Sequence, residues 1–254
     1  MADALVLCYH AVSERWPATL AITPARLEEQ LRFLARRGYG ARTFSDTLAQ
    51  PDRGLTVAVT FDDAYRSVFE HAYPVLRALG MPATVFVPTD LVGTGAPMSW
   101  PGIEQWLNGP HARELIGMSW AQLGELADAG WEIGSHTRSH ARLTSLHDDA
   151  LADELTGSRE QCERRLGRPC RTLAYPYGAI DRRVVRAAGE AGYLGAGAPP
   201  NRLPEDSRLR WPRVGVYPAD DIRRFRVKVS PLVRRLMGSP VWPPLARLGQ
   251  GLRL

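Results

Sequence analysis

Acidic and imidazole side chains occur in this sequence at spacings that suit a catalytic divalent metal. His136 and His140 are four residues apart in the segment SHTRSH, and Asp62 and Asp63 are adjacent in the segment TFDD. Two His and one carboxylate that leave coordination positions open form the ligand set of a metal that activates a water. Of two neighbouring carboxylates, one can bind the metal while the other accepts a proton from the water.

Each motif also has a structural explanation. Asp pairs often act as caps at strand ends, and two His residues at this spacing often share a surface without binding a metal. The zinc-protease motif with this His spacing needs Glu directly after the first His, whereas Thr137 stands here. The preceding run WEIGS is typical of a strand, so we expect a strand-end loop to carry both His residues.

Strand-type and helix-type segments alternate along the chain. Apolar or β-branched runs predict buried strands at 4–9, 55–61, 82–87, 131–135, 171–175 and 193–198. Periodicity and capping residues predict helices at 24–37, 65–79, 121–130, 148–166 and 181–191. This alternation favours parallel βαβ units, arranged as a barrel or as a doubly wound sheet.

The chemistry-bearing residues directly follow the predicted strands. They are His10, Asp62, Asp63, His136, His140 and Tyr177. In both architectures, functional side chains gather at the carboxyl ends of the strands. We therefore expect these residues to meet at one end of the sheet.

The composition is that of an ordinary globular protein. The 254 residues are 44% hydrophobic and 23% charged, and three cysteines without a Cys-x-x-Cys pair fit a reducing compartment. No apolar run approaches the roughly 18 residues of a membrane span, and no signal-peptide pattern is found. These features predict a cytoplasmic location.

Positive charge is concentrated near the carboxyl terminus. Residues 201–254 carry 12 Lys or Arg against 4 Asp or Glu, but no nucleic-acid-binding motif accompanies them, so nucleic acid is not an expected partner. We expect a catalytic domain at 1–228, with a loop insertion at 93–118 that forms a substrate rim. A basic, Pro-containing tail at 229–254 either packs over the domain or contacts an anionic membrane surface weakly. The sequence does not determine the oligomeric state.

Three motifs in this order, TFDD, SHTRSH and AYPYG, resemble those of the polysaccharide deacetylases with the NodB homology domain, carbohydrate esterase family four. The resemblance covers about residues 4–217. It implies an α/β fold, a distorted (β/α) TIM-like barrel in a single domain. It also implies metal-dependent hydrolysis of the N-acetyl group of an N-acetylated saccharide or glycolipid. The expected metal is zinc, with cobalt and nickel as alternatives.

The resemblance implies a role for each matching residue. Asp62 is the expected general base, and Asp63, His136 and His140 are the expected metal ligands. Tyr177 lies in the Pro-Tyr-Gly motif, whose backbone N–H helps to hold the oxyanion in this family.

The sequence departs from the family pattern at three places. Ala64 stands where the first motif commonly ends in Gly. Ala174 stands where an Arg often orients the base, and Arg213 is a candidate to replace that Arg by its position in the sequence alone. The C-terminal Leu-x-His that supplies the acid is missing, since no His follows His147. A departing amine must be protonated, and His10, in a Tyr-His-x-Val context that resembles the poly-N-acetylglucosamine deacetylase subgroup, is the candidate acid.

Two other functions stay open. One is a catalytically silent carbohydrate-binding protein of the same fold, although such a protein has no need to keep base and metal ligands together. The other is a metal-dependent O-acyl esterase. Four tryptophans offer flat faces for sugar rings or fill the core: Trp100, Trp106, Trp120 and Trp211.

Overall fold

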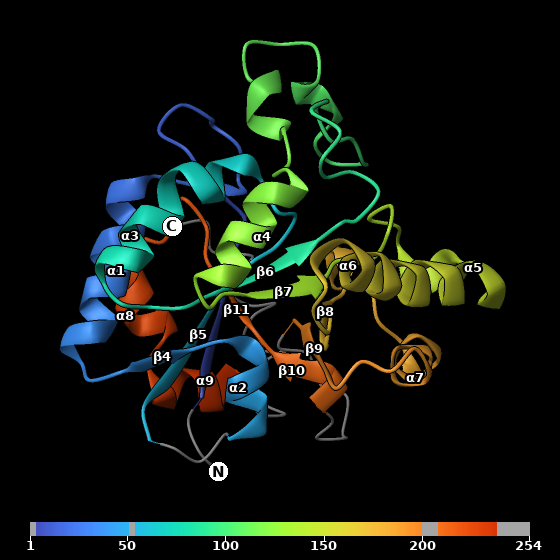
Figure 1. Ribbon diagram of the computed structural model, residues 1–254. Helices are drawn as coiled ribbons and strands as arrows, with labels where there is room; N and C mark the ends of the chain where they lie inside the picture. Colours follow the sequence, from blue (N-terminus) through green and yellow to red (C-terminus); the bar gives the residue numbers. More distant parts are fainter. Residues whose placement is uncertain (1–3, 51–53, 200–207, 238–254) are drawn as a thin grey trace, which may run out of the picture.

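A parallel sheet curls into a barrel in this computed structural model, which describes residues 4–50, 54–199 and 208–237 (Figure 1). Along the sheet, the strands follow the order β10 (Trp211–Pro212), β9 (Gly195–Ala198), β8 (Thr172–Ala174), β7 (Glu132–Ser135), β6 (Thr84–Val87), β5 (Thr56–Phe61), β1 (Leu5–Tyr9) and β11 (Val214–Gly215). A further strand, β4 (Gly40–Arg42), also pairs with β5, and β2 (Ala11–Val12) pairs with β3 (Ala21–Ile22). The expected TIM-like barrel is confirmed.

One short segment closes the barrel. β10 and β11 lie at opposite ends of the strand order, yet only Arg213 separates them in the sequence. Trp211 pairs with Gly197 of β9, and Val214 pairs with Leu7 of β1. Arg213 therefore stands at the seam where the two edges of the sheet meet.

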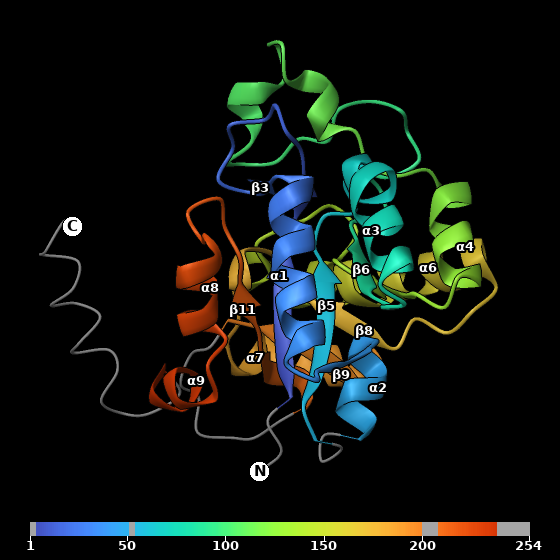
Figure 2. The same ribbon diagram turned by 90° about the vertical axis from the view of Figure 1, so that its left-hand side faces the viewer.

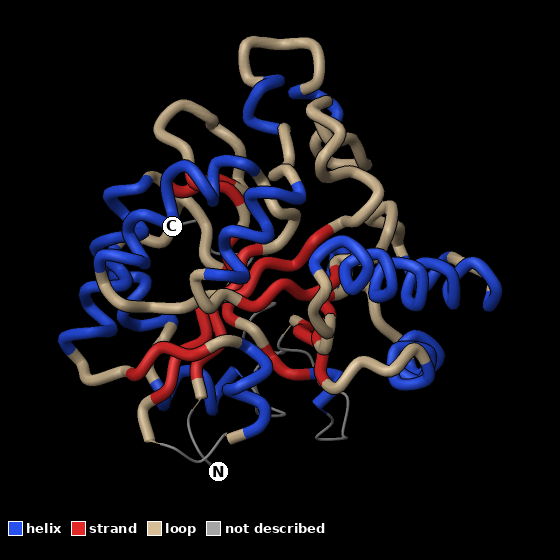
Figure 3. The backbone as a smooth tube through the Cα atoms, viewed as in Figure 1, coloured by secondary structure: helices blue, strands red, loops and turns tan. Residues whose placement is uncertain are grey.

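Helices surround the strands (Figure 3). They are α1 (Pro24–Arg36), α2 (Phe44–Ala49), α3 (Tyr73–Ala78), α4 (Trp120–Asp128), α5 (Asp148–Ala152), α6 (Ser158–Leu166), α7 (Arg182–Glu190), α8 (Ile222–Lys228) and α9 (Pro231–Met237). Single π-helical turns at Val68–Ala72 and Asp153–Gly157 lead into α3 and α6. None of the helices in the described ranges is long and apolar enough to cross a membrane.

The expected strands and helices form within a few residues of their expected positions. Thr23 caps α1 by accepting from the N–H of Arg26, and Ser119 with Gln122 forms a capping box at α4. Several short elements were not predicted from the sequence: α2, α8, α9, β2, β3, β4, β10 and β11. Of the expected tail at 229–254, α9 is described, whereas residues 238–254 lie outside the described residues.

The barrel interior is filled by few side chains. Its buried cluster consists of Val6, Phe44, Leu48, Ala58, Phe86 and Ala174, with α2 contributing two of them. Space is tight enough to require glycine: a Cβ at Gly134 would lie 2.7 Å from the ring of Phe86, and one at Gly195 would lie 2.0 Å from Leu48. A larger core cluster packs the outer faces of the strands against the helices.

Two connections rise above the carboxyl ends of the strands. One is the segment after β1, and the other is the insertion at 93–118 (Figure 2). The Ser13 hydroxyl donates to Glu114 over 3.0 Å, and the rings of Trp16 and Trp106 meet edge to face with centroids 6.2 Å apart. The two connections thus support each other beside the pocket described next.

Candidate active site

A pocket of about 420 Å³ opens at the carboxyl ends of the strands. All six residues singled out in the sequence line it: His10, Asp62, Asp63, His136, His140 and Tyr177. Cys8, Trp100 and Arg213 line it as well. The barrel topology therefore brings together residues that are far apart in the sequence.

Unusual backbone conformations are concentrated at this pocket. Within the described ranges, the non-glycine residues with positive φ are Asp63 (69°), Ala64 (51°), Thr137 (64°), His140 (61°) and Tyr177 (58°). This left-handed region is disfavoured for residues with a Cβ, and such strain is typical of functional sites. Ala64, where the family commonly has Gly, thus adopts a conformation that Gly would adopt without that cost.

Three ligand atoms converge at the ends of β5 and β7. The Oδ1 atom of Asp63 lies 3.2 Å from the Nε2 atoms of both His136 and His140, and all three side chains are buried. No described residue gives this Oδ1 a hydrogen bond of acceptable geometry. One anionic oxygen and two imidazole nitrogens thus lie close together, but the oxygen accepts no hydrogen bond from either ring. This arrangement fits the ligand set of a divalent cation.

The two imidazoles are held in different ways. The Nδ1 atom of His136 lies 2.8 Å from the carbonyl of Ala174; it donates to this carbonyl and so leaves the Nε2 lone pair toward Asp63. In contrast, the Nδ1 of His140 has no hydrogen-bond partner among the described residues. Its ring stacks on Trp100, with centroids 4.2 Å apart and planes at 24°, and meets the edge of Tyr177 at 4.7 Å.

Burial and mutual contact shift the ionisation of these groups. Burial acts to raise the pKa of Asp63, but its contacts with His136 and His140 more than offset it and hold that pKa well below the usual range. Burial acts to lower the pKa of His136, yet the contact with Asp63 and the nearby Asp62 charge raise it overall. For His140, burial dominates and lowers the pKa. The Asp63 carboxylate is therefore anionic at neutral pH.

Asp62 is fixed by a buried ion pair. Its two carboxylate oxygens accept hydrogen bonds from the Nη1 and Nη2 atoms of Arg213 at 2.6 and 2.8 Å. Burial acts to raise the pKa of Asp62, but the charge and hydrogen bonds of Arg213 outweigh it and lower this pKa to about 2. The guanidinium has room because position 197 is glycine: a Cβ there would lie 2.4 Å from the Arg213 Nε. The position of Arg213 in the sequence had suggested such a contact with the expected base, Asp62.

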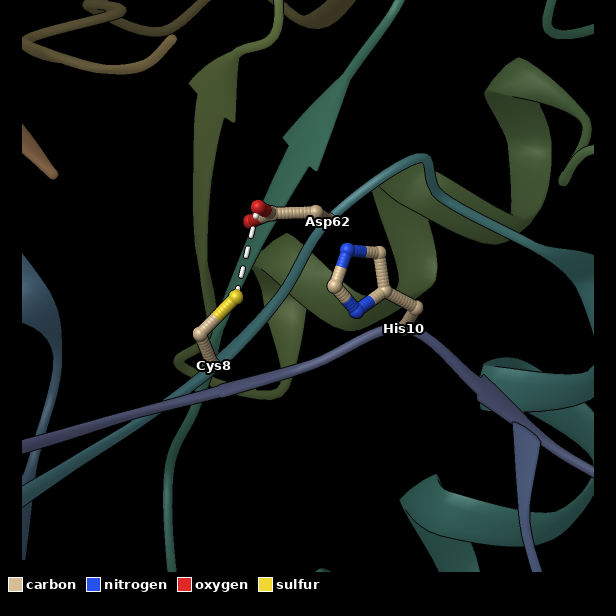
Figure 4. Close-up of side chains that lie close together, drawn as sticks. All are labelled: Cys8, His10 and Asp62. Atoms are coloured by element: carbon tan, nitrogen blue, oxygen red, sulfur yellow. Dashed lines mark hydrogen bonds between the residues drawn. The ribbon is translucent and has the colours of Figure 1, made fainter. Parts of the chain in front are cut away.

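His10 lies beside Asp62 because of the strand register (Figure 4). Tyr9 of β1 pairs with Phe61 of β5, and the backbone N–H of Asp62 donates to the Tyr9 carbonyl over 2.9 Å. His10 and Asp62, which directly follow these two residues, therefore lie side by side. His10 is half-buried, and no described residue bonds to its buried Nδ1. The ring is thus placed in the pocket without a carboxylate or carbonyl to hold that nitrogen.

Two pocket residues had not been anticipated in these roles. Cys8 points into the barrel two residues before His10, and the alternation of the run LVLCYH could have indicated it. Trp100 had been considered as a sugar platform, but it is only 6% exposed and its face is occupied by His140. The other three tryptophans considered for sugar contact, Trp106, Trp120 and Trp211, do not line the pocket.

Comparison with known proteins places this arrangement in a family. The sequence profile of the polysaccharide deacetylase family matches residues 49–196. The Bacillus subtilis protein YxkH is 26% identical over 232 residues, which are 89% of this chain and 71% of that protein. The poly-beta-1,6-N-acetyl-D-glucosamine N-deacetylase of Staphylococcus epidermidis is 23% identical over 217 residues, covering 75% of this chain and 70% of that one.

Solved structures show the same fold. A polysaccharide deacetylase from Bacillus cereus has 25% sequence identity and a TM-score of 0.73, over 89% of this chain and 69% of that one. The structure of IcaB from Ammonifex degensii has 26% identity and a TM-score of 0.68, over 94% and 98% of the two chains. His10 and Arg213 lie outside the range that the family profile matches, so the profile match does not extend to them.

Proposed function

Because the chain belongs to the polysaccharide deacetylase family, a family of hydrolases that remove N-acetyl groups, we propose that its pocket deacetylates an N-acetylglucosamine-containing saccharide or glycolipid with the help of one divalent cation. The names of several relatives support this substrate class. The single observation that carries the proposal is the convergence of Asp63, His136 and His140 beside the ion-paired Asp62.

The cation site would be formed by Asp63 Oδ1 and the Nε2 atoms of His136 and His140. One oxygen and two imidazole nitrogens favour Zn²⁺, and Co²⁺ or Ni²⁺ also suit this donor set. When bound, the cation would polarise the acetamide carbonyl and promote ionisation of the attacking water.

The protein's own side chains would move the protons. Asp62, which is ionised at neutral pH, accepts a proton from the attacking water as oxygen bonds to the acetyl carbon. Arg213 holds both carboxylate oxygens and so fixes the orientation of the base. The backbone N–H of Tyr177 would donate to the oxyanion, and His10 would give a proton to the sugar nitrogen as the carbon–nitrogen bond breaks. The products are acetate and a free amine.

The test is to measure acetate and free amine together. Purified protein is incubated with N-acetylglucosamine oligosaccharides, an N-acetylated glycolipid and an O-acetylated sugar, each with and without chelator. We expect equimolar acetate and amine from N-acetylated substrates, lost with chelator and with Asp62→Asn. Acetate from the O-acetylated sugar alone would instead identify an esterase, and binding without product would identify a silent carbohydrate-binding protein.

The proposed ligands are tested by metal analysis of Asp63→Ala and His136→Ala. Each variant should bind far less metal than the unmodified protein while keeping its circular-dichroism spectrum. If both folded variants keep one equivalent of metal, the cation does not bind where we propose.

A further inference from the structure

A second set of ligand-type side chains lies in the same pocket: Cys8, His10 and Asp62 (Figure 4). One sulfur, one ring nitrogen and one carboxylate oxygen from these residues lie within 4.8 Å of one another. The Cys8 sulfur is 3.4 Å from Asp62 Oδ2. Tetrahedral zinc ligands at about 2.0–2.3 Å from the ion lie roughly 3.5 Å apart, so this pair already has the required spacing.

The strand register produces this cluster. Cys8 and His10 are two residues apart, so both point to the same side of β1, and Cys8 pairs with Thr60 of β5, two residues before Asp62. Cys8 and Asp62 are 8% and 4% exposed. The paired strands fix Cys8 and Asp62, and His10 follows directly after the end of β1.

Each member of the cluster has capacity to bind a cation. The buried Nδ1 of His10 has no hydrogen-bond partner among the described residues. The two oxygens of Asp62 each accept one bond from Arg213, and a carboxylate offers about four lone-pair sites in all. The thiol of Cys8 donates only a weak hydrogen bond to Asp62, which a metal can replace.

We propose that Cys8, His10 and Asp62 form a second, inhibitory site for a thiophilic divalent cation such as Zn²⁺ or Cd²⁺. The cation takes up the Cys8 sulfur as thiolate, the thiol proton passes to solvent, and bonds form to a His10 nitrogen and an Asp62 oxygen; no group is oxidised or reduced. A thiolate ligand selects Zn²⁺ and Cd²⁺ over Mg²⁺ and Ca²⁺. Binding here is weaker than at Asp63, because the Arg213 charge and the first cation both repel the second cation.

Inhibition follows from the identity of the ligands. This consequence rests on the proposed function, in which Asp62 is the base and His10 is the acid. A cation that binds both removes them from proton transfer while leaving the first cation in place. Turnover should therefore rise with the first equivalent of zinc and fall as free zinc increases further.

The first arm of the test measures binding and does not depend on activity. Metal-stripped protein is titrated with Cd²⁺ while the thiolate-to-cadmium charge-transfer absorption is followed. Unmodified protein should bind a first equivalent of Cd²⁺ without any charge-transfer absorption. A second equivalent should then bind and produce this absorption band. Cys8→Ala and the nearly isosteric Cys8→Ser should lose the band. The matched controls Cys162→Ala and Cys170→Ala change cysteines that lie outside this pocket, and they should keep it.

The second arm measures inhibition. In Cys8→Ala, the free Zn²⁺ concentration that halves activity should rise at least tenfold, whereas Mg²⁺ should not inhibit either protein. A band that persists in both Cys8 variants, or equal zinc inhibition with and without Cys8, would overturn the inference. If no substrate is deacetylated, the proposed function fails, but the cadmium titration still decides whether the second site exists.

Discussion

The Asp62 side chain is subject to two opposing influences that determine its ionisation. Burial favours the protonated acid, and the bidentate contact with Arg213 favours the carboxylate more strongly, which leaves a pKa of about 2. A base with this pKa is ionised throughout the neutral and mildly acidic range. The acidic limit of turnover should therefore be set by another group in the unmodified protein.

Removing the Arg213 charge should shift this limit. In Arg213→Leu, the strongest influence that offsets burial is removed, so the pKa of Asp62 rises and turnover at saturating metal should be lost first at acidic pH. Arg213→Lys keeps the charge but not the bidentate contact, and its acidic limit should lie between those of Arg213→Leu and the unmodified protein. The measurement is kcat against pH, with thermal melts to check folding. A uniform loss at every pH would show that Arg213 acts on geometry alone.

The proposed role of His10 as the acid predicts a dependence on the leaving group. An amine leaves poorly unless it is protonated, whereas the phenolate of an activated aryl acetate leaves without help. His10→Ala should therefore lose about 10²–10⁴-fold in kcat on an acetamide substrate and much less on the aryl ester. Both rates are measured at matched metal content. An equal loss on the two substrates would assign His10 to binding or structure.

The insertion at 93–118 reaches the proposed metal centre through Trp100. The indole stacks on His140, whose Nδ1 has no hydrogen-bond partner in the described parts of the chain, and Tyr65 packs against the indole at 6.2 Å. Stacking on Trp100 therefore orients the His140 ring, as the hydrogen bond to the Ala174 carbonyl orients the His136 ring. The insertion thus has a positioning role in addition to the rim role expected from the sequence.

Trp100→Ala should loosen the metal centre. Loss of a group that orients a metal ligand typically costs 10–100-fold in affinity, and we expect a loss of about 10-fold by chelator competition. Trp100→Phe keeps an aromatic face and should restore most of the affinity. Trp106→Ala is the matched control: Trp106 lies in the same insertion as Trp100 and contacts Trp16 outside it. This variant should bind metal normally. If the control loses as much affinity as Trp100→Ala, the insertion as a whole is responsible.

The sequence predicted the elements that have a strong periodicity. Apolar runs and capping residues located six strands and five helices, but their alternation left both a barrel and a doubly wound sheet open. The barrel was implied by the resemblance of the three motifs to the deacetylase family. Short elements such as β10 and β11 have two residues each and no periodicity, so the closure of the barrel at Arg213 could not be read from the chain. The contacts of Cys8 and Trp100 depend on register and loop packing, which local patterns do not encode.

The proposed cation would join segments that are far apart in the sequence. Its proposed ligands follow β5 and β7, which lie on either side of β6 in the sheet, so a bound cation should stabilise the folded protein as a unit. A cation at 100 times its dissociation constant adds about 2.7 kcal/mol, and each kcal/mol raises the Tm of a protein of this size by roughly 2–4 °C. Loading metal-free protein should therefore raise Tm by about 5–10 °C, measured by calorimetry. Asp63→Ala should show almost none of this increase.

Metal reconstitution tests whether one cation per chain is required for deacetylation. Metal-stripped protein receives Zn²⁺ in steps up to one equivalent, and acetate release from an N-acetylglucosamine oligosaccharide is measured together with bound metal at each step. We predict that activity is absent without metal and increases in proportion to bound metal up to one ion per chain, with one free amine formed per acetate. Acetate release by the stripped protein, or a full equivalent of bound metal without any release, would show that the protein is not the metal-dependent deacetylase proposed here.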